Sequence, residues 1–251
     1  MPEEQTMPAI EDEAARLLEA ATEAGVEIRL TGGLAIRAHA DGAIPEPLRR
    51  EYHDIDLVTR RNQSRAVERF LAGAGYTPNN EFNALNGRDR LLFYDLSRDR
   101  QLDVFVGHFK MCHDIPIADR LELDPVTVPL AELLLTKLQI YELNEKDRRD
   151  VMTILAGHDV GDGDGETINS AYIARLCSDD WGLWRTLKLN VERCRSAIEE
   201  YGFDPATHDR IRDRLDALWA AVDAEPKSRR WKMRDRVGDR KRWYELPDEV
   251  V

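Results

Sequence analysis

The sequence predicts an α/β protein in which a small mixed-sheet core is followed by a helical C-terminal region. Two observations carry this prediction. Segments of strand length alternate with helix-like segments through the first half of the chain, whereas only helix patterns remain after Ile168. The pattern changes after Pro129, so we expect the boundary between the two parts to lie between Pro125 and Gly165.

Helix and strand patterns alternate in the first half. Apolar residues at helical spacing predict the first helix, which Gly25 ends, and short apolar or alternating runs predict the strands. The predicted helices cover residues 10–24, 34–40 and 64–72, and the predicted strands cover residues 26–30, 54–59, 91–96 and 102–106.

The second half has helix patterns on both sides of a stretch rich in Gly and Asp. Predicted helices cover residues 131–143 and 146–155, joined near Asn144, and then residues 184–201 and 206–222. We therefore divide the chain into three parts. These are an α/β domain with its trailing helices over residues 1–156, a linker over 157–167 and a helical region over 168–251.

Length and composition describe a folded chain with one large domain or two small ones. It has 251 residues, of which 42% are hydrophobic and 33% charged, as is typical of a soluble globular protein. No apolar run approaches the roughly 18–20 residues that span a bilayer, and residues 1–4 lack the basic start of a secretory signal. Three widely spaced cysteines predict reduced thiols in a cytoplasmic protein: Cys112, Cys177 and Cys194.

Charge is distributed unevenly along the chain. The net charge of −12 argues against general affinity for nucleic acid, because binding to phosphates depends on cations. Residues 227–244, which we call the basic segment, nevertheless hold nine Lys or Arg and two Asp, with three aromatic residues among them. This segment can bind an RNA backbone with its tryptophans stacked on bases, or it can pack on the acidic body of the same chain. We favour the second interpretation, since the other helices are acidic.

Asp54 and Asp56 are the sharpest candidates for chemistry. In a strand, residues two apart point to the same face, so these carboxylates project together while Ile55 and Leu57 face the core. Adjacent carboxylates repel each other unless a cation lies between them, and such oxygen ligands suit a hard divalent ion such as Mg²⁺. A solvated strand edge with two surface acids is the alternative.

Asp103 is a single acid in an otherwise apolar strand, where an unpaired carboxylate is costly to bury. If its strand lies beside that of Asp54 and Asp56, the three acids can hold two metal ions. One ion would activate an attacking hydroxyl and the other would stabilise a leaving pyrophosphate. The alternative is a structural aspartate paired with Arg98 or Arg100.

Gly32 and Gly33 lie between a predicted strand and a predicted helix. Glycine lets a phosphate approach the backbone closely, and a helix N-terminus adds free N–H groups and a favourable dipole. The spacing matches neither a Walker loop nor a dinucleotide-binding fingerprint. A tight turn explains the pair equally well.

Two further patterns lack the residues that their chemistry needs. Residues 159–166 resemble a calcium loop, but Gly161 and Gly163 occupy two of its ligand positions, so we interpret this stretch as a linker. His108, Cys112 and His113 form a cluster without the paired cysteines typical of structural zinc sites, and we expect no zinc there.

The order strand, Gly-Gly, helix, Asp-x-Asp strand and single-Asp strand resembles the nucleotidyltransferase superfamily that includes DNA polymerase β. Within it, the chain looks most like the AbiEii/MenT group of nucleotidyltransferase toxins, over residues 26–156. The matching motifs are Gly32-Gly33-Leu34-Ala35-Ile36, His53-Asp54-Ile55-Asp56-Leu57, and Lys137-Leu138 with the later Asp147-Arg148-Arg149-Asp150. Two features depart from the group: the loop over residues 41–53 is long, and Lys146 stands where Arg is more usual.

The resemblance implies a metal-dependent enzyme that moves a nucleoside monophosphate from an NTP to a hydroxyl acceptor and releases pyrophosphate. Asp54 and Asp56 would bind Mg²⁺ or Mn²⁺, and Asp103 would act as a third ligand or as a base.

The resemblance also assigns roles outside the acidic residues. Gly32 and Gly33 would hold the triphosphate. Lys137 would reach a phosphate, and Asp147 would orient that lysine or assist as a base. From the residues alone, a solvated helix face is the alternative for Lys137 and its charged neighbours Lys146, Arg148 and Arg149.

The acceptor stays open. It can be RNA, with tRNA as the choice that the resemblance favours, a protein side chain or a small molecule, and a toxin role implies a cognate antitoxin. Two other classes compete with a toxin-like enzyme: a small-molecule nucleotidyltransferase of the antibiotic-resistance kind, and a non-catalytic nucleotide-binding module of the same fold.

Overall fold

The computed structural model describes residues 6–40 and 44–246, and the chain divides into two units. Unit 1 comprises residues 1–38, 51–109 and 116–128, and unit 2 comprises residues 39–50, 110–115 and 129–251. The N-terminal residues 1–4 and part of the loop over 41–53 lie outside the described residues.

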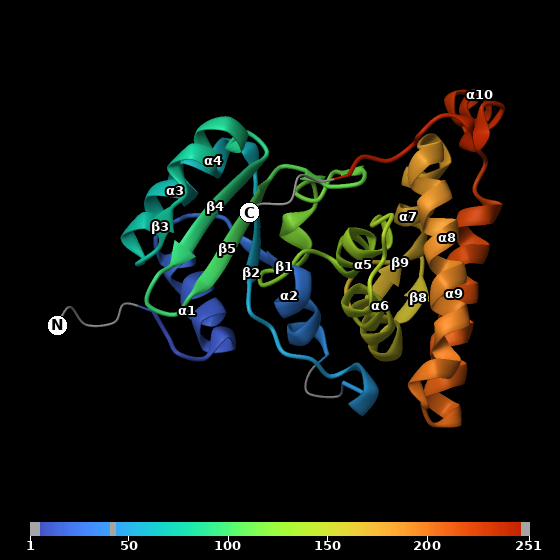
Figure 1. Cartoon of the computed structure of the whole chain (residues 1–251), viewed down its shortest axis with the longest axis horizontal. Coiled ribbons are helices and arrows are strands. Elements are labelled where there is room, and N and C mark those ends of the chain that lie inside the picture. Colours follow the sequence, from blue (N-terminus) through green and yellow to red (C-terminus); the bar gives the residue numbers. More distant parts are fainter. Residues whose placement is uncertain (1–5, 41–43, 247–251) are drawn as a thin grey trace. The chain divides into compact units, whose positions relative to one another are not determined.

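A five-stranded mixed sheet, in the order β1-β2-β5-β4-β3, forms unit 1 (Figure 1). β2 and β5 are parallel, and the other neighbouring strands are antiparallel. The strands are β1 (Arg29–Thr31), β2 (Ile55–Thr59), β3 (Thr77–Pro78), β4 (Arg90–Asp95) and β5 (Arg100–Val106). The predicted α/β class with a mixed sheet is therefore confirmed.

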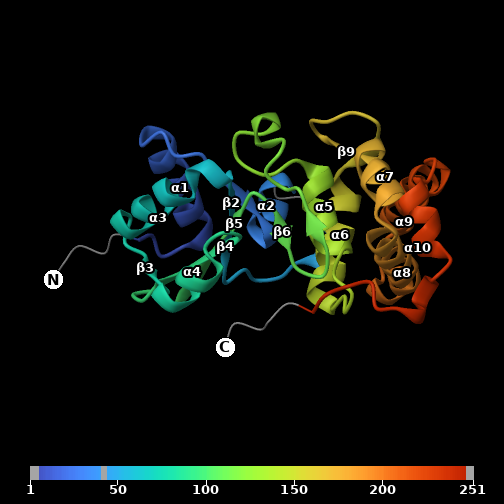
Figure 2. The ribbon, with the colours of Figure 1, turned by 90° about the horizontal axis from the view of Figure 1, so that it is seen from above.

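Four helices accompany this sheet: α1 (Ile10–Glu23), α2 (Gly32–His39), α3 (Ser64–Gly73) and α4 (Asn80–Asn86). Figures 1 and 2 show α3 and α4 beside the β3–β4 end of the sheet. The sequence did not predict α4. The helix α4 has no buried residue and therefore no apolar stripe that a sequence pattern could show. Its N-terminus is capped by the Asn79 side chain, which accepts a hydrogen bond from Phe82 N at 3.0 Å.

Unit 2 is mainly helical, as predicted for the C-terminal region. Its helices are α5 (Leu130–Leu138), α6 (Glu145–Gly157), α7 (Ser170–Asp179), α8 (Trp181–Ala197), α9 (Pro205–Ala224) and α10 (Arg229–Asp235). α8 and α9 run side by side in Figure 1. Shorter 3₁₀ segments include η1 (Glu46–Leu48) and η4 (Ile198–Tyr201).

The sequence places the helices expected over residues 131–143 and 146–155 in the first domain, but α5 and α6 belong to unit 2. The reason lies in α5, where all residues except Lys137 are buried. A helix that is buried all round needs partners on several sides. α5 finds them in α6, α7, α8 and strand β9 (Thr167–Asn169).

The stretch expected to be a linker contains a small sheet. β8 (Asp159–Gly161) pairs in parallel with β9, and Val160 lies opposite Ile168. The prediction that only helices follow from Ile168 onwards is thus wrong at residues 168 and 169, which belong to β9. Three-residue strands carry no visible period, so only the pairing partner could identify them.

The three cysteines are free and buried. Burial raises the pKa of the Cys194 thiol to about 12, so the neutral form prevails. Among the described residues, no helix has both the length and the apolar character needed to cross a membrane.

Candidate functional site

Asp56 and Asp103 lie directly opposite each other on the parallel strands β2 and β5. On the other side of Asp56, β1 places Thr31 opposite the same residue. Residues in register on neighbouring strands share a face of the sheet, so Thr31, Asp56 and Asp103 form a polar row across three strands. The flanking Ile55 and Leu57 are fully buried on the opposite face.

Asp54 directly precedes β2 and is exposed, although the predicted strand included it. The strand ladder begins only at Ile55, which pairs with Leu102. Asp54 is two residues before Asp56, which is the spacing that puts two extended residues on one face. We call Asp54, Asp56 and Asp103 the carboxylate row.

Asp103 is buried, with only 3% of its surface exposed, and both of its oxygens are hydrogen-bonded. Arg90 Nε donates to Oδ1 at 2.7 Å, and Gln101 Nε2 donates to Oδ2 at 2.8 Å. The pairing proposed as the alternative, with Arg98 or Arg100, is therefore not the one formed. Antiparallel pairing of β4 with β5 brings Arg90 to the polar row. Arg100 instead donates to the carbonyl oxygens of residues 7 and 8.

Arg90 is held over apolar rings as well as beside Asp103. Its guanidinium lies 5.4 Å from the centroid of Phe105 and 5.7 Å from that of Phe82. A guanidinium placed over aromatic faces keeps its charge while part of its hydration is lost. Arg90 is thus a fixed cation at one end of the carboxylate row, and it is not among the site residues predicted from the sequence.

Gly32 lies against Asp56. Its φ is +65°, and a Cβ added there would be 2.0 Å from Asp56 Oδ2 and 2.9 Å from Asp56 Cγ. Glycine is therefore required at position 32 both for its backbone conformation and for the close approach of the carboxylate. α2 also begins at Gly32, so the free N–H groups of its first turn lie beside the polar row.

The carboxylate oxygens of the carboxylate row are ligands that fit a hard divalent cation. Neighbouring strands lie about 4.8 Å apart, so carboxylates in register can share one ion through short metal–oxygen bonds. The three carboxylates and the Arg90 guanidinium together carry a formal charge of −2. Thr31 Oγ1 is also buried there with no hydrogen-bond partner among the described residues, so the polar row contains one unsatisfied hydroxyl.

Lys137 and Asp147 meet in unit 2. Asn144 caps α6 through a hydrogen bond from Asp147 N to its Oδ1 at 2.9 Å, and the resulting turn brings α6 back toward α5. Lys137 Nζ lies 3.2 Å from Asp147 Oδ1 and 2.9 Å from Asp150 Oδ2. The solvated-face alternative therefore does not describe Lys137, whose side chain is 13% exposed.

Asp150 connects Lys137 to a second cation. Arg50 donates from Nε and Nη2 to the two oxygens of Asp150, both at 2.8 Å. We call Arg50, Lys137, Asp147 and Asp150 the lysine cluster. The i, i+3 spacing of Asp147 and Asp150 could have indicated a shared helix face, whereas nothing in the sequence pointed to Arg50.

The other basic residues of α6 are surface residues. Arg148 and Arg149 pair with Glu145 within α6, and Lys146 is exposed. Lys137 and Asp147 belong to unit 2 and the carboxylate row to unit 1, so the expected role of Lys137 toward a nucleotide phosphate stays a prediction.

The aromatic residues of the basic segment pack on unit 2. Trp231 is buried, 5.1 Å from Trp184 by ring centroids, and Trp243 Nε1 donates to Thr186 Oγ1 at 3.1 Å. Tyr244 stacks on Tyr141 at 3.5 Å. The two tryptophans are thus engaged inside the unit rather than presented for base stacking.

Most basic side chains of the basic segment are exposed to solvent. Seven of them are exposed and form no ion pair with any described residue: Arg229, Arg230, Lys232, Arg236, Arg240, Lys241 and Arg242. The two acids of the segment are engaged, since Asp235 accepts from Trp181 Nε1 and Asp239 pairs with Arg185. The packing interpretation therefore describes the aromatic residues, while the cations remain available to an anionic partner.

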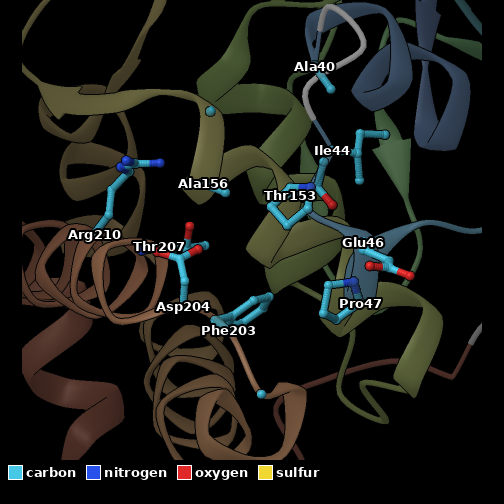
Figure 3. A pocket seen from close by; sticks show the side chains of 13 residues that line it. Ala40, Ile44, Glu46, Pro47, Thr153, Ala156, Phe203, Asp204, Thr207 and Arg210 are labelled. Carbon is cyan, nitrogen blue, oxygen red and sulfur yellow. Dashed lines mark hydrogen bonds between the residues drawn. The ribbon is translucent and has the colours of Figure 1, made fainter.

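Unit 2 also contains a pocket of about 610 Å³ (Figure 3). It is lined by residues from η1, the C-terminal end of α6 and the start of α9, with Glu46, Asp204 and Arg210 as its charged side chains. None of the residues predicted from the sequence for catalysis lines it. The carboxylate row, rather than this pocket, therefore remains the candidate for chemistry.

His113 and Cys112, set aside as zinc ligands, have other contacts. His113 Nε2 lies 2.8 Å from Thr186 Oγ1, and Cys112 Sγ accepts from Tyr141 N at 3.4 Å. Burial lowers the pKa of His113 to about 4, which keeps its imidazole neutral.

Comparison with protein-family models, curated proteins and solved structures finds no match for this chain.

Proposed function

We propose that the chain is a metal-dependent nucleotidyltransferase that transfers a nucleoside monophosphate from an NTP to a hydroxyl acceptor. The observation that carries this proposal is that Asp56 lies in register with Asp103 and that Gly32 lies against the Asp56 carboxylate. This arrangement joins a cation-binding row to the N-terminus of a helix, which are the two elements that a metal-bound triphosphate needs.

Each part of the row has a role in the proposed reaction. Asp54, Asp56 and Asp103 would hold Mg²⁺ or Mn²⁺, which supplies positive charge to the phosphates. Asp103, with both oxygens fixed by Arg90 and Gln101, suits a ligand better than a base. The N–H groups at Gly32 and Gly33 would bind the outer phosphates.

The bond changes follow from in-line displacement. The acceptor hydroxyl oxygen bonds to the α-phosphorus, and the bond from that phosphorus to the bridging oxygen of the pyrophosphate breaks. The proton of the hydroxyl leaves to a base, and pyrophosphate takes the electron pair of the broken bond. The residues of the row would orient the triphosphate for this step, and the cation that they would hold would supply positive charge to its phosphates.

A labelling assay tests the proposal. Purified protein is incubated with each α-labelled NTP in turn, with Mg²⁺ or Mn²⁺ and total tRNA, beside a lane without RNA and an Asp56→Asn control. Metal-dependent label on an acceptor that the control does not produce supports the proposal. Label of equal intensity from Asp56→Asn would assign the activity to a contaminant or to other residues.

One observation favours a second candidate, the non-catalytic nucleotide-binding module. Asp103 already has two hydrogen-bonded oxygens, so it can serve as a purely structural residue. The two candidates differ in one outcome. A binding module binds NTP and transfers no label to RNA, to protein or to a small-molecule acceptor such as an aminoglycoside, whereas a nucleotidyltransferase labels one of them.

RNA is the acceptor class that we propose, with tRNA as the first substrate to test. The seven exposed cations of the basic segment support it, because an acidic chain that leaves so many cations without ion pairs has a surface complementary to a polyanion. A toxin role and its antitoxin remain proposals that follow from the family resemblance alone.

A further inference from the structure

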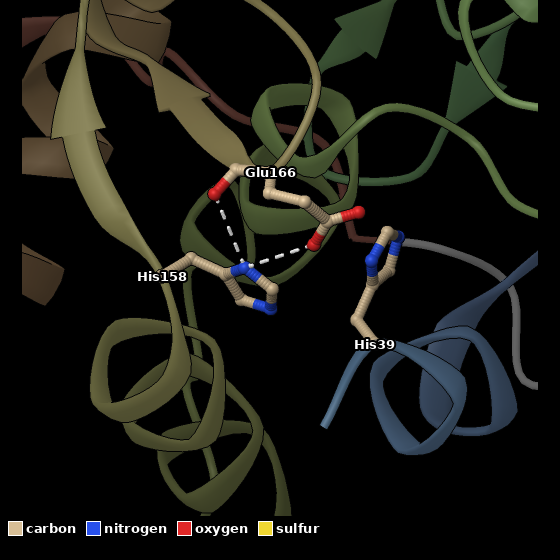
Figure 4. Close-up of side chains that lie close together, drawn as sticks. All are labelled: His39, His158 and Glu166. Carbon is tan, nitrogen blue, oxygen red and sulfur yellow. Dashed lines mark hydrogen bonds and ion pairs between the residues drawn. The ribbon is translucent and has the colours of Figure 1, made fainter. Parts of the chain in front are cut away.

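Two histidines and a glutamate converge in unit 2 (Figure 4). His39 is the last residue of α2, His158 follows α6, and Glu166 precedes β9. One ligand atom from each of these three side chains lies within 4.8 Å of the other two. Three different segments therefore bring metal-ligating groups to one point, and we call His39, His158 and Glu166 the histidine cluster.

His158 is the buried member of the cluster. Its side chain is 8% exposed, and its Nδ1 is 3.3 Å from Glu166 O and 3.5 Å from Glu166 Oε2. Its Nε2 is buried and has no hydrogen-bond partner among the described residues. A buried imidazole with one long contact and one unpartnered nitrogen is poorly satisfied, and such groups in native proteins usually have a further ligand.

The arrangement of the two rings suits ligation. The centroids of His39 and His158 are 5.5 Å apart with an interplanar angle of 87°, so the rings meet edge to face rather than stacked. A metal-bound histidine coordinates through one nitrogen and commonly donates its other N–H to a backbone carbonyl or a carboxylate. Glu166 offers both kinds of acceptor to His158.

We propose that the histidine cluster binds a divalent transition-metal ion of the Zn²⁺ type. Two imidazole nitrogens and one carboxylate oxygen form a ligand set that Zn²⁺ prefers, and three protein ligands leave a position for water. Mg²⁺ prefers oxygen ligands alone, which the carboxylate row offers and this cluster does not. The inference is therefore independent of the proposed nucleotidyl transfer.

Metal binding would join three segments of unit 2. The end of α6 and the residue before β9 are adjacent through the β8–β9 sheet, and Glu166 itself is 81% exposed. A bound ion fixes Glu166 against His39 and His158 and so restrains the connection between β8 and β9. Because only the native state presents all three ligands together, the ion should raise the unfolding temperature.

Zn²⁺ titration of the metal-stripped full chain tests the proposal, with isothermal calorimetry for stoichiometry and Co²⁺ absorption for geometry. We expect one tightly bound ion in the wild type. Glu166→Gln, which alters an exposed side chain, and His39→Asn should each weaken binding about tenfold or more. His208→Asn is the matched control, because His208 also contacts an acid, Glu199, but lies outside the cluster.

A further variant separates this site from the carboxylate row. Asp56→Asn should retain the bound ion, whatever its effect on nucleotidyl transfer. Absence of a stoichiometric ion in the wild type, or equal binding by Glu166→Gln, His39→Asn and the wild type, would overturn the proposal. Loss of the ion in Asp56→Asn alone would place it at the carboxylate row and would also overturn it.

Discussion

Asp56 of β2 and Asp103 of β5 are cross-strand neighbours in a parallel pair, so their carboxylates emerge side by side from one face of the sheet. Arg90 neutralises one of them, and Gly32 lets the other lie against the start of α2. Substitutions in the carboxylate row are therefore the most direct test of the proposed nucleotidyl transfer.

Asp56→Asn should abolish nucleotidyl transfer and leave the fold intact, and Asp54→Asn should do the same. The amide keeps the size of the carboxylate but removes the charge that holds the cation. Label transfer from α-labelled NTP measures the effect, and circular dichroism checks the fold. Asp162→Asn, an exposed acid of unit 2, is the control and should remain fully active. Full activity of either row variant would remove that residue from the site.

Gly32→Ala should impair metal-dependent NTP binding more than it impairs folding. Gly25→Ala is a close control, because Gly25 has φ +67° and no atom within 4 Å of an added Cβ. Both variants carry the left-handed backbone cost of about 1–2 kcal/mol. Only Gly32→Ala also displaces the Asp56 carboxylate. Equal losses of NTP affinity in the two variants would show that the contact with Asp56 has no part in binding.

Lys137 and Asp147 should be energetically coupled. Lys137→Gln leaves the buried Asp147 and Asp150 with less positive charge, so the single variants should each destabilise unit 2. A double-mutant cycle with Asp147→Asn, followed by urea denaturation, should give a coupling energy of about 1–3 kcal/mol. Additive effects would mean that the contact contributes no net stability.

The same Lys137 variant also tests the role implied by the family resemblance. If Lys137 contacts a nucleotide phosphate, folded Lys137→Gln should bind NTP more weakly than the wild type in the presence of Mg²⁺. If its role is structural alone, NTP affinity should be unchanged once the fraction of folded protein is taken into account.

Stability should fall in mild acid because of His113. Its pKa is lowered from 6.5 to about 4 in the folded state by burial, so the unfolded state binds the proton more readily. The stabilising effect is complete above pH 6.5 and is lost as the pH falls toward 4. The loss is at most a few kcal/mol. Denaturation midpoints at several pH values should fall less steeply for His113→Asn than for the wild type, and identical slopes would contradict the assignment.

Removing cations from the basic segment should weaken RNA binding and reduce its salt dependence. Replacing Lys232, Arg236 and Arg240 by Ala together should lower the slope of log affinity against log salt by about 2 for single-stranded RNA. The matched control replaces three exposed arginines of unit 1: Arg65, Arg69 and Arg88. Equal losses from the two triple variants would indicate a general charge effect rather than a surface in the basic segment.

The sequence by itself located several of the helices and strands and selected the candidate acids. Apolar periodicity located α1, α3 and β5, and the Asp-x-Asp pattern selected Asp54 and Asp56, because these signals depend on residues that are neighbours along the chain. The sequence also predicted two helices joined near Asn144, since a cap and two helices are local features, and this junction is the turn that a meeting of Lys137 with Asp147 requires.

Tertiary structure alone decided which distant residues share a site. The pairing of β2 with β5 placed Asp103 opposite Asp56, and the pairing of β4 with β5 selected Arg90 as its partner over the nearer Arg100. Strand register, and the meeting of His39 with His158, depend on pairings between segments far apart in the chain. Local patterns do not encode such pairings, because hydrogen bonding across a sheet and packing between helices are set by the fold as a whole.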